Sequence, residues 1–253
     1  MHTLIYAIFI VTLFFTSGCD APETSSQTAP TGAITRMLIF TKTAGYRHES
    51  IEVGTEIFRE LARKQGVETD HTEDAAAFNA ERLSQYQIIA FLNTTGDVLN
   101  ETQQSVFEAY IRGGGHFYGI HSAADTEHDW PFYGELVGGY FKNHPLDPNI
   151  RRGKIEVLVR DHPSTRMLDS TWVRQEEWYN YTHFGQHLHP LLNLDENSYE
   201  GGENGAYHPI AWQHEKWGGK AFYTGGGHLA DAFREPLFQQ HLAGGLEYLL
   251  QSE

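Results

Sequence analysis

The amino-acid sequence predicts an α/β protein with a doubly wound, mostly parallel sheet and long loops over the carboxyl edge of that sheet. Through the first half of the chain, short apolar segments alternate with segments of helical periodicity, which is typical of parallel strands joined by helices. Residues 113–123 place three glycines before an apolar strand that runs into His121 and Ser122. The second half is less regular and contains long, aromatic, histidine-rich loops, and such loops are more often functional than decorative.

The first half of the chain contains most of the elements expected in the parallel unit. Residues 37–41, 67–70 and 86–92 are predicted as its first three strands, and the third is apolar enough to lie at the centre of the sheet. Ser50 is expected to cap a helix that has apolar residues at helical spacing and that stops at Gly66.

Three further helices and several strands are predicted after residue 92. One helix begins after Asn100 and ends at Ile111, and another is expected at residues 131–141 with Asp129 favoured as its cap. Residues 236–250 close the chain as an amphipathic helix. The strands expected in the same part of the chain lie at residues 116–120, 155–159, 172–174, 209–212 and 220–223.

The amino-terminal residues predict an exported protein of the bacterial cell envelope. Residues 4–15 form an apolar run that is too short to span a bilayer but is suited to a signal peptide. Small residues precede Cys19, as in a bacterial lipobox, in which Cys19 is lipidated after cleavage behind Gly18. The alternative is a plain secretory signal that leaves Cys19 as a free thiol. The expected boundaries are a signal peptide at residues 1–18, a lipid-anchored flexible tether at residues 19–35 and one folded domain at residues 36–253.

The composition limits the partners of this chain. It has 253 residues and a formal net charge of −15, so a nucleic-acid backbone would be repelled and no nucleic-acid partner is expected. Membrane contact is expected through the lipid anchor only. Because Cys19 is the single cysteine, no disulfide can form within the chain.

The turn after the strand at residues 116–120 is a candidate site. Small residues, Gly119 and Ala123, flank His121 and Ser122, as a strained strand-to-helix elbow requires. The carboxyl ends of parallel strands are where ligands bind in open α/β sheets. The alternative is an ordinary strand-to-helix loop.

Several segments together resemble the ThuA-like (trehalose utilisation) family. They are FTKTAGYRH at residues 40–48, the glycine-rich segment 113–133, EEWYN at residues 176–180 and HPIAW at residues 208–212. The resemblance runs from about residue 36 to residue 250. It implies a flavodoxin-like fold of the class I glutamine-amidotransferase type and a role in disaccharide or keto-sugar catabolism. True amidotransferases carry a nucleophilic thiol at the elbow, and His121 stands there in this chain, so amidotransferase chemistry is not expected.

The fifteen histidines cluster at the ends of predicted strands and in loops. His48, His121 and His228 follow three strands that should end at the same edge of the sheet, so they are predicted to share one site. Neutral imidazoles are general bases near pH 7 and ligands of divalent metals such as zinc, and both roles stay open for these three residues. His144 and His183 lie in loops expected to cover that edge, where they would contact substrate. For any single histidine, the alternative is a hydrogen-bonded structural residue.

Glu177 is the carboxylate predicted to act as an acid or base. The aromatic residues that follow Glu177 in the sequence are expected to desolvate its carboxylate and raise its pKa. Alternation along the strand would leave Glu176 solvated. Asp125 is expected to hold His121 or a sugar hydroxyl group. The alternative for Glu177 is an ordinary surface carboxylate.

Aromatic side chains near polar loops are candidates for stacking on sugar rings. Trp130, Trp178, Tyr179 and Trp212 are predicted substrate contacts, and the alternative is packing in the core or at its rim. Ser122 is a further predicted substrate contact. It is not expected to be a nucleophile, because His121 and not Ser122 occupies the apex of the elbow.

The sequence therefore predicts an exported protein that acts on a sugar or keto-sugar derivative. His121, Glu177 and His48 are the expected catalytic residues, and a metal such as zinc held by His48, His121 and His228 is the expected form of assistance. The alternative is a non-catalytic, carbohydrate-binding lipoprotein.

Overall fold

The computed structural model describes Met1 and residues 35–251. Residues 2–34, which contain Cys19 and nearly all of the predicted signal peptide and tether, fall outside the described part of the chain. Among the described residues, no helix has the length and apolar character that crossing a membrane requires.

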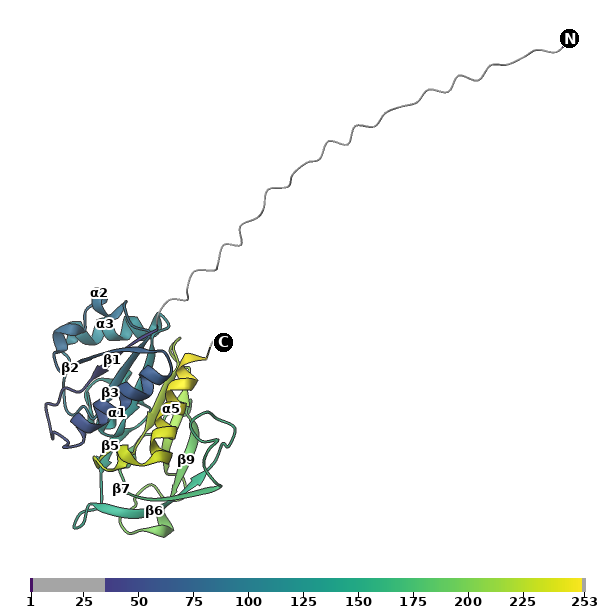
Figure 1. Ribbon diagram of the computed structural model, residues 1–253. Coiled ribbons are helices and arrows are strands. Elements are labelled where there is room, and N and C mark those ends of the chain that lie inside the picture. The colour runs from purple at the N-terminus through teal and green to yellow at the C-terminus, as the bar shows by residue number, and fades with distance from the viewer. Residues whose placement is uncertain (2–34, 252–253) are drawn as a thin grey trace. The chain divides into compact units, whose positions relative to one another are not determined.

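One nine-stranded sheet forms the centre of the folded unit (Figure 1). Five neighbouring strands are parallel and have the order β2-β1-β3-β4-β11, which is the flavodoxin-like arrangement. The fold class predicted from the sequence is therefore confirmed. The parallel strands are β2 (Glu68–Thr72), β1 (Arg36–Phe40), β3 (Ile88–Leu92), β4 (His116–Ile120) and β11 (Ala221–Thr224).

The second half of the chain extends this sheet with antiparallel strands. Their order beyond β11 is β10-β9-β6-β7, so β7 is an edge strand. The added strands are β10 (Pro209–His214), β9 (His189–Asp195), β6 (Ile150–Val157) and β7 (Thr171–Glu177). A separate pair, β5 (Tyr140–Asn143) and β8 (Asn180–Thr182), forms a small antiparallel ribbon.

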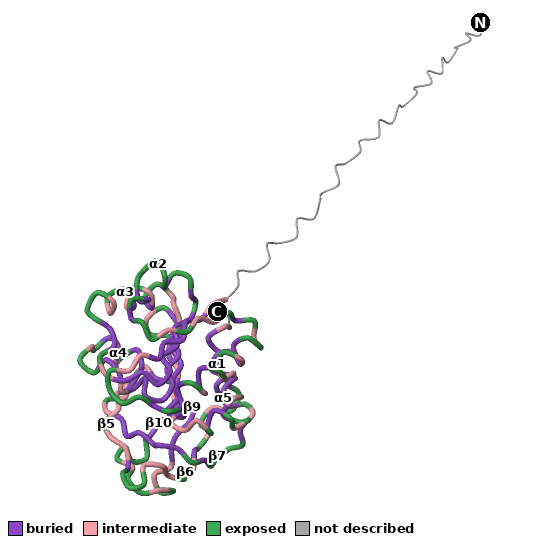
Figure 2. The backbone as a smooth tube through the Cα atoms, turned by 60° about the vertical axis from the view of Figure 1, so that its left-hand side comes forward, coloured by how far each residue is buried: buried purple, intermediate pink, exposed green. Residues whose placement is uncertain are grey.

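Helices cover both faces of the parallel strands (Figure 2). Helices α1 (Ile51–Lys64) and α5 (Pro236–Leu250) pack together on one face, and α3 (Glu101–Arg112) and α4 (Pro131–Val137) lie on the other. The short α2 (Ala80–Leu83) precedes β3. Strand β3 is buried along its whole length, because helices exclude water from both of its faces.

Two predicted helix caps differ from the structure, and one is as expected. Asn100 forms a capping box with Gln103 at the start of α3. Ser50 precedes α1 but makes no side-chain cap, because its hydroxyl donates to the carbonyl oxygen of Gly227 instead. Asp129 does not cap α4, since Trp130 occupies the N-cap position and proline follows it without a side-chain hydrogen bond.

The predicted helix at residues 131–141 is too long. It ends at Val137, because Gly138 adopts a left-handed conformation with φ of +93°. Residues 140–143 form β5 instead. This turn brings the next loop back over the carboxyl edge of the sheet, where the candidate site lies.

Candidate functional site

Four side chains that can bind a metal converge at the carboxyl edge of the sheet. His48 lies between β1 and α1, while His121 and His228 follow β4 and β11. Glu177, the last residue of β7, joins them from the antiparallel extension. One nitrogen or carboxylate oxygen of each residue lies within 4.8 Å of the others. The structure thus brings together the three histidines that the topology predicts to meet, and Glu177, the carboxylate predicted to act with them, lies in the same cluster.

The backbone at His121 forms the predicted elbow. Its φ is +48°, a left-handed conformation that side chains other than glycine rarely adopt. Tyr223 donates its hydroxyl hydrogen bond to the His121 carbonyl oxygen (2.8 Å), and His121 Nδ1 donates to the carbonyl oxygen of Gly225 (2.9 Å). Nδ1 therefore carries the proton, so Nε2, 3.5 Å from Glu177 Oε2, is left as the metal-binding nitrogen.

His48 is buried and neutral. Burial, reinforced by the imidazoles of His121 and His228, lowers the pKa of His48 to about 2. The hydroxyl of Ser122 lies 3.3 Å from His48 Nδ1, so the predicted substrate contact is a buried neighbour of this ring. A neutral imidazole is the form that binds a divalent metal.

Glu177 is held as a carboxylate. Burial acts to raise the pKa of Glu177, but contacts with His121 and His228 outweigh burial and hold that pKa well below its usual range. Its Oε2 lies 2.9 Å from His228 Nδ1, and its Oε1 accepts a hydrogen bond from Asn149 (2.7 Å). The prediction of a raised pKa is wrong, because imidazoles and not aromatic rings surround the charged oxygens.

His228 responds to the same contact in the opposite direction. Burial acts to lower the pKa of His228, but the Glu177 carboxylate outweighs burial and raises it above the ordinary value. Nε2 of His121 is buried and makes no hydrogen bond to another described residue, whereas Nδ1 of His228 pairs with the Glu177 carboxylate at 2.9 Å. Both nitrogens lie near the same carboxylate oxygen, Glu177 Oε2, at 3.5 Å for His121 and 2.9 Å for His228.

The predicted solvation of Glu176 is also wrong. Trp172, Arg174 and Glu176 alternate along β7 and are all buried, because this face of the edge strand packs against α5 and the turn after β11. Glu177 ends the strand and is covered by loops on the opposite face. The carboxylates of Glu176 and Glu177 are therefore both buried.

A cavity of about 340 Å³ opens beside the four-residue cluster. Three predicted substrate contacts, Asp125, His144 and Tyr179, are among the residues that line it. Asp125 accepts a hydrogen bond from His128 (2.8 Å) and does not reach His121 through any hydrogen bond of the described residues. The residues that line the cavity are Tyr46, His48, Asp125, Phe141, His144, Asn149, Glu177, Tyr179 and His228.

The comparisons with known proteins agree with this fold. The family model for ThuA, described as trehalose utilisation, matches residues 36–249. The chain belongs to the ThuA family. Membership of this family relates it to trehalose utilisation. Its match covers the parallel unit, the antiparallel extension and all four residues of the cluster.

Solved structures similar to this ThuA chain share its fold. A ThuA-like protein from Bacteroides uniformis is 23% identical, with a TM-score of 0.72 over 90% of this chain and 97% of that one. A second, from Parabacteroides merdae, is 17% identical, with a TM-score of 0.68 over 87% and 92%. A β-galactosidase from Bacillus circulans is 13% identical with a TM-score of 0.54, and the match covers 85% of this chain but 31% of the enzyme. No curated protein matches the ThuA chain significantly.

Several predicted substrate contacts lie away from the cavity. Trp178 donates to the carbonyl oxygen of Arg151, and Trp212 donates to that of Val137, so both indoles are satisfied within the protein interior. Trp130 and His183 do not line the cavity either. Trp130 packs against Phe107, Phe132 and Tyr133. His183 is exposed and follows β8. For the three tryptophans the structure agrees with the packing alternative.

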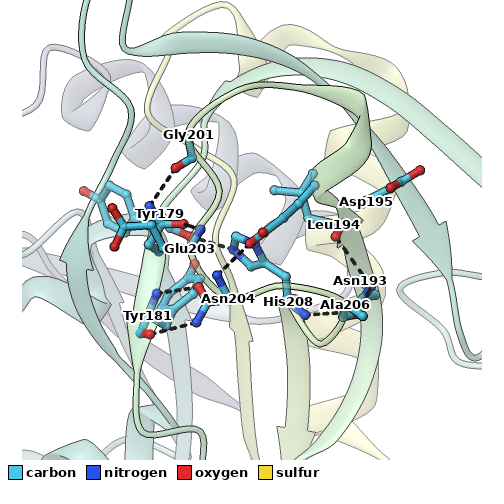
Figure 3. A network of polar contacts seen from close by, with 12 residues as sticks. Tyr179, Tyr181, Asn193, Leu194, Asp195, Gly201, Glu203, Asn204, Ala206 and His208 are labelled. Atoms are coloured by element: carbon cyan, nitrogen blue, oxygen red, sulfur yellow. Dashed lines mark hydrogen bonds and ion pairs between the residues drawn. The ribbon is translucent and has the colours of Figure 1, made fainter.

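Tyr179 reaches the site because a polar network holds the segment around it. Its ring lies 4.3 Å from that of His121. Figure 3 shows His208 beside this segment, and His208 Nε2 donates to the carbonyl oxygen of Tyr179 (2.8 Å). Asn204 binds both the amide and the carbonyl group of Tyr181. These bonds fix the segment between β7 and β8 from which Tyr179 closes one side of the cavity.

The sequence interpretation missed Asn149, Tyr46 and Phe141, which also line the cavity. Asn149 follows Pro148, and a proline-containing turn in a loop over the carboxyl edge is the signal that could have identified it. Tyr46 and Phe141 lie inside segments that the sequence marked, but nothing in their spacing distinguishes a cavity wall from core packing.

A larger, more open hollow of about 920 Å³ lies along α1 and β2, away from the cluster. Its charged side chains bind one another, as in the pairs of Arg47 with Glu52 and of Arg63 with Glu60. Exposed pairs of this kind are typical of a solvated surface, so the smaller cavity beside Glu177 is the stronger functional candidate.

Proposed function

We propose that this ThuA-family protein is an exported enzyme that acts on a sugar or keto-sugar derivative at a divalent-metal centre. The observation that carries the proposal is the convergence of His48, His121, His228 and Glu177, with one donor atom of each within 4.8 Å of the others. Ligand atoms around a zinc ion at about 2.1 Å are roughly 3.4 Å apart, so small side-chain rotations would close the set around a cation.

The protonation states of His48 and Glu177 support a metal better than free acid–base chemistry by these two residues. His48 is kept neutral and Glu177 is kept ionised, and these are the forms that bind a cation. A carboxyl group with a depressed pKa is a poor proton donor near pH 7. In this proposal His121, His48 and Glu177 therefore act as ligands and not as the proton-transferring groups.

The cavity supports a polyhydroxylated substrate. Asp125, Asn149 and His144 offer polar atoms, while Phe141 and Tyr179 offer ring faces of the kind on which sugars stack. A bound divalent cation would polarise a carbonyl or hydroxyl oxygen of the substrate.

His144 is the group best placed to exchange a proton with substrate. Its Nδ1 donates to the carbonyl oxygen of Pro145 (2.8 Å), so Nε2 is the acceptor of the neutral ring. Nε2 lies 3.5 Å from Glu177 Oε1, and His144 lines the cavity.

Metal titration followed by a substrate screen tests the proposal. We expect the protein to bind Co²⁺ or Zn²⁺ with about one ion per chain, and Glu177→Gln to weaken binding by at least about tenfold because it removes the only charged ligand. His183→Ala is the control, since His183 is exposed outside the cavity. Disaccharides and their keto derivatives are then screened for turnover with and without metal. A protein that binds no divalent ion would contradict the metal centre.

A non-catalytic carbohydrate-binding protein is the second candidate. The exposure of Tyr46, 64% at the cavity mouth, favours it, because an open aromatic side chain is typical of a sugar-stacking surface. Binding of sugars without turnover, and with the same affinity after metal removal by a chelator, would support this function over the enzyme.

Export with lipid anchoring is the proposed location. It rests on the apolar run at residues 4–15 and on Cys19 behind small residues. Cys19→Ser is expected to move the protein from the membrane fraction to the soluble fraction, as measured by fractionation of cells. Unchanged partitioning would instead support a plain secretory signal or a leader that is not cleaved.

A further inference from the structure

Glu176 is a buried carboxylate beside the proposed metal ligand Glu177, and the metal centre does not use it. Its Oε2 accepts a hydrogen bond from the Gly227 amide (2.9 Å), and its Oε1 accepts one from the His228 amide (3.2 Å). The Glu177 amide also donates to Oε1 (3.1 Å). One fully buried side chain thus binds the backbone of two of the four proposed ligands, His228 and Glu177.

Arg174 supplies the counter-charge for this carboxylate. Its Nη2 lies 3.3 Å from Glu176 Oε2, and 4% of the arginine side chain is exposed. The guanidinium stacks on Phe238 of α5 at 4.3 Å and on Trp172 of β7 at 4.8 Å from the ring centres. A buried carboxylate without such a partner would be strongly unfavourable, so the Arg174 guanidinium compensates the burial of Glu176.

The peptide bond between Gly227 and His228 is held at both of its polar groups. The Gly227 carbonyl oxygen accepts hydrogen bonds from Ser50 Oγ (2.9 Å) and Asn93 Nδ2 (3.0 Å), while Glu176 binds the amide on the other side. Gly227 itself has φ of +120°, a conformation that L side chains rarely adopt. The turn after β11 is therefore built to present His228 in one orientation.

We propose that Glu176 is a positioning residue that sets the spacing between His228 and Glu177, with Arg174 as its buried counter-charge. The inference rests on the proposed metal function and adds to it a determinant of metal affinity that touches neither metal nor substrate. The carboxylate is required, rather than any polar group of this size, because the two oxygens accept three backbone N–H groups.

Glu176→Gln tests the inference on the full-length protein. The amide retains one acceptor oxygen but turns an NH₂ group toward a backbone N–H, so His228 should lose its fixed position. We expect the Kd for Co²⁺ to rise about 10- to 100-fold, the usual effect of changing a group that orients a metal ligand, and the visible Co²⁺ spectrum to change. Glu156→Gln is the matched control, because Glu156 is an exposed carboxylate on β6, the strand paired with β7.

A second readout separates failure of the inference from failure of the metal proposal. Hydrogen exchange at the Gly227 and His228 amides should be slow in the wild type and faster in Glu176→Gln, with or without metal. If the wild type binds no Co²⁺, the metal proposal fails and this exchange alone decides the role of Glu176. Unchanged exchange, or a lower melting temperature with unchanged Co²⁺ affinity and spectrum, would overturn the positioning role.

Glu176→Asp keeps the test decisive if the glutamine variant does not fold. Aspartate retains the charge beside Arg174 but is one methylene shorter, so it cannot reach both amides of the turn. A folded Glu176→Asp protein with weakened Co²⁺ affinity supports the inference, and one with wild-type affinity overturns it.

Discussion

At the scale of single residues, His121 combines a strained backbone conformation with a side chain that can bind a metal. Two hydrogen bonds help to hold its left-handed conformation: Tyr223 donates to its carbonyl oxygen, and its Nδ1 donates to the carbonyl oxygen of Gly225. The same two bonds aim Nε2 at Glu177 and leave it without a hydrogen-bond partner. A residue with only a structural role would not need an unsatisfied buried nitrogen, so the strain serves to present the imidazole.

His121→Asn separates these two roles. Asparagine tolerates the left-handed conformation but lacks the imidazole, so the elbow should be retained while the ligand is lost. We expect kcat/KM on a substrate found by the screen to fall by about 10² or more, with little change in the melting temperature. The kinetic constants and a thermal melt of the same preparation measure both effects. Full activity combined with a lower melting temperature would show that His121 is a structural elbow residue.

At the scale of secondary-structure elements, the parallel half of the molecule could be predicted well from the sequence. The strand at 116–120 and the helix at 236–250 have the predicted bounds, because glycines and proline mark their ends and apolar periodicity marks their interiors. The strand ends in turn place His48, His121 and His228 at one edge. Local patterns were enough for these residues because the carboxyl ends of parallel strands meet there.

The antiparallel extension could not be predicted to the same degree. Whether the side chain of Glu176 or of Glu177 is buried depends on what covers each face of β7. The covering groups come from α5 and from the turn after β11. The direction of the Glu177 pKa shift depends on imidazoles contributed by distant strands. Alternation within one strand carries no information about these long-range contacts, so both expectations were wrong.

At the scale of the whole molecule, the fold buries several histidines that have no part in the cluster. His241 of α5 and His214 of β10 are almost fully buried, and burial lowers the pKa of each to about 4. Arg174 and His162 also lower the pKa of His241. His187 and Lys216 also lower the pKa of His214, whereas Glu135 raises it. Both rings are hydrogen-bonded in ways that suit the neutral form, since each donates to a backbone carbonyl group.

These buried histidines predict that the protein loses stability in mild acid. In the unfolded chain a histidine takes up its proton near pH 6.5, whereas in the folded chain His241 and His214 do so only near pH 4. The unfolded state therefore binds more protons in this window, so the free energy of unfolding is highest above pH 6.5 and falls as the pH decreases toward 4. By linkage the loss is about 3 kcal/mol for each ring, partly offset by His228, whose raised pKa favours the folded state in acid. Urea unfolding between pH 7.5 and 4.5, with a chelator present to exclude metal release, measures this loss, and His241→Gln should flatten the curve. A free energy of unfolding that is constant over this range would contradict the assignment of these rings as neutral.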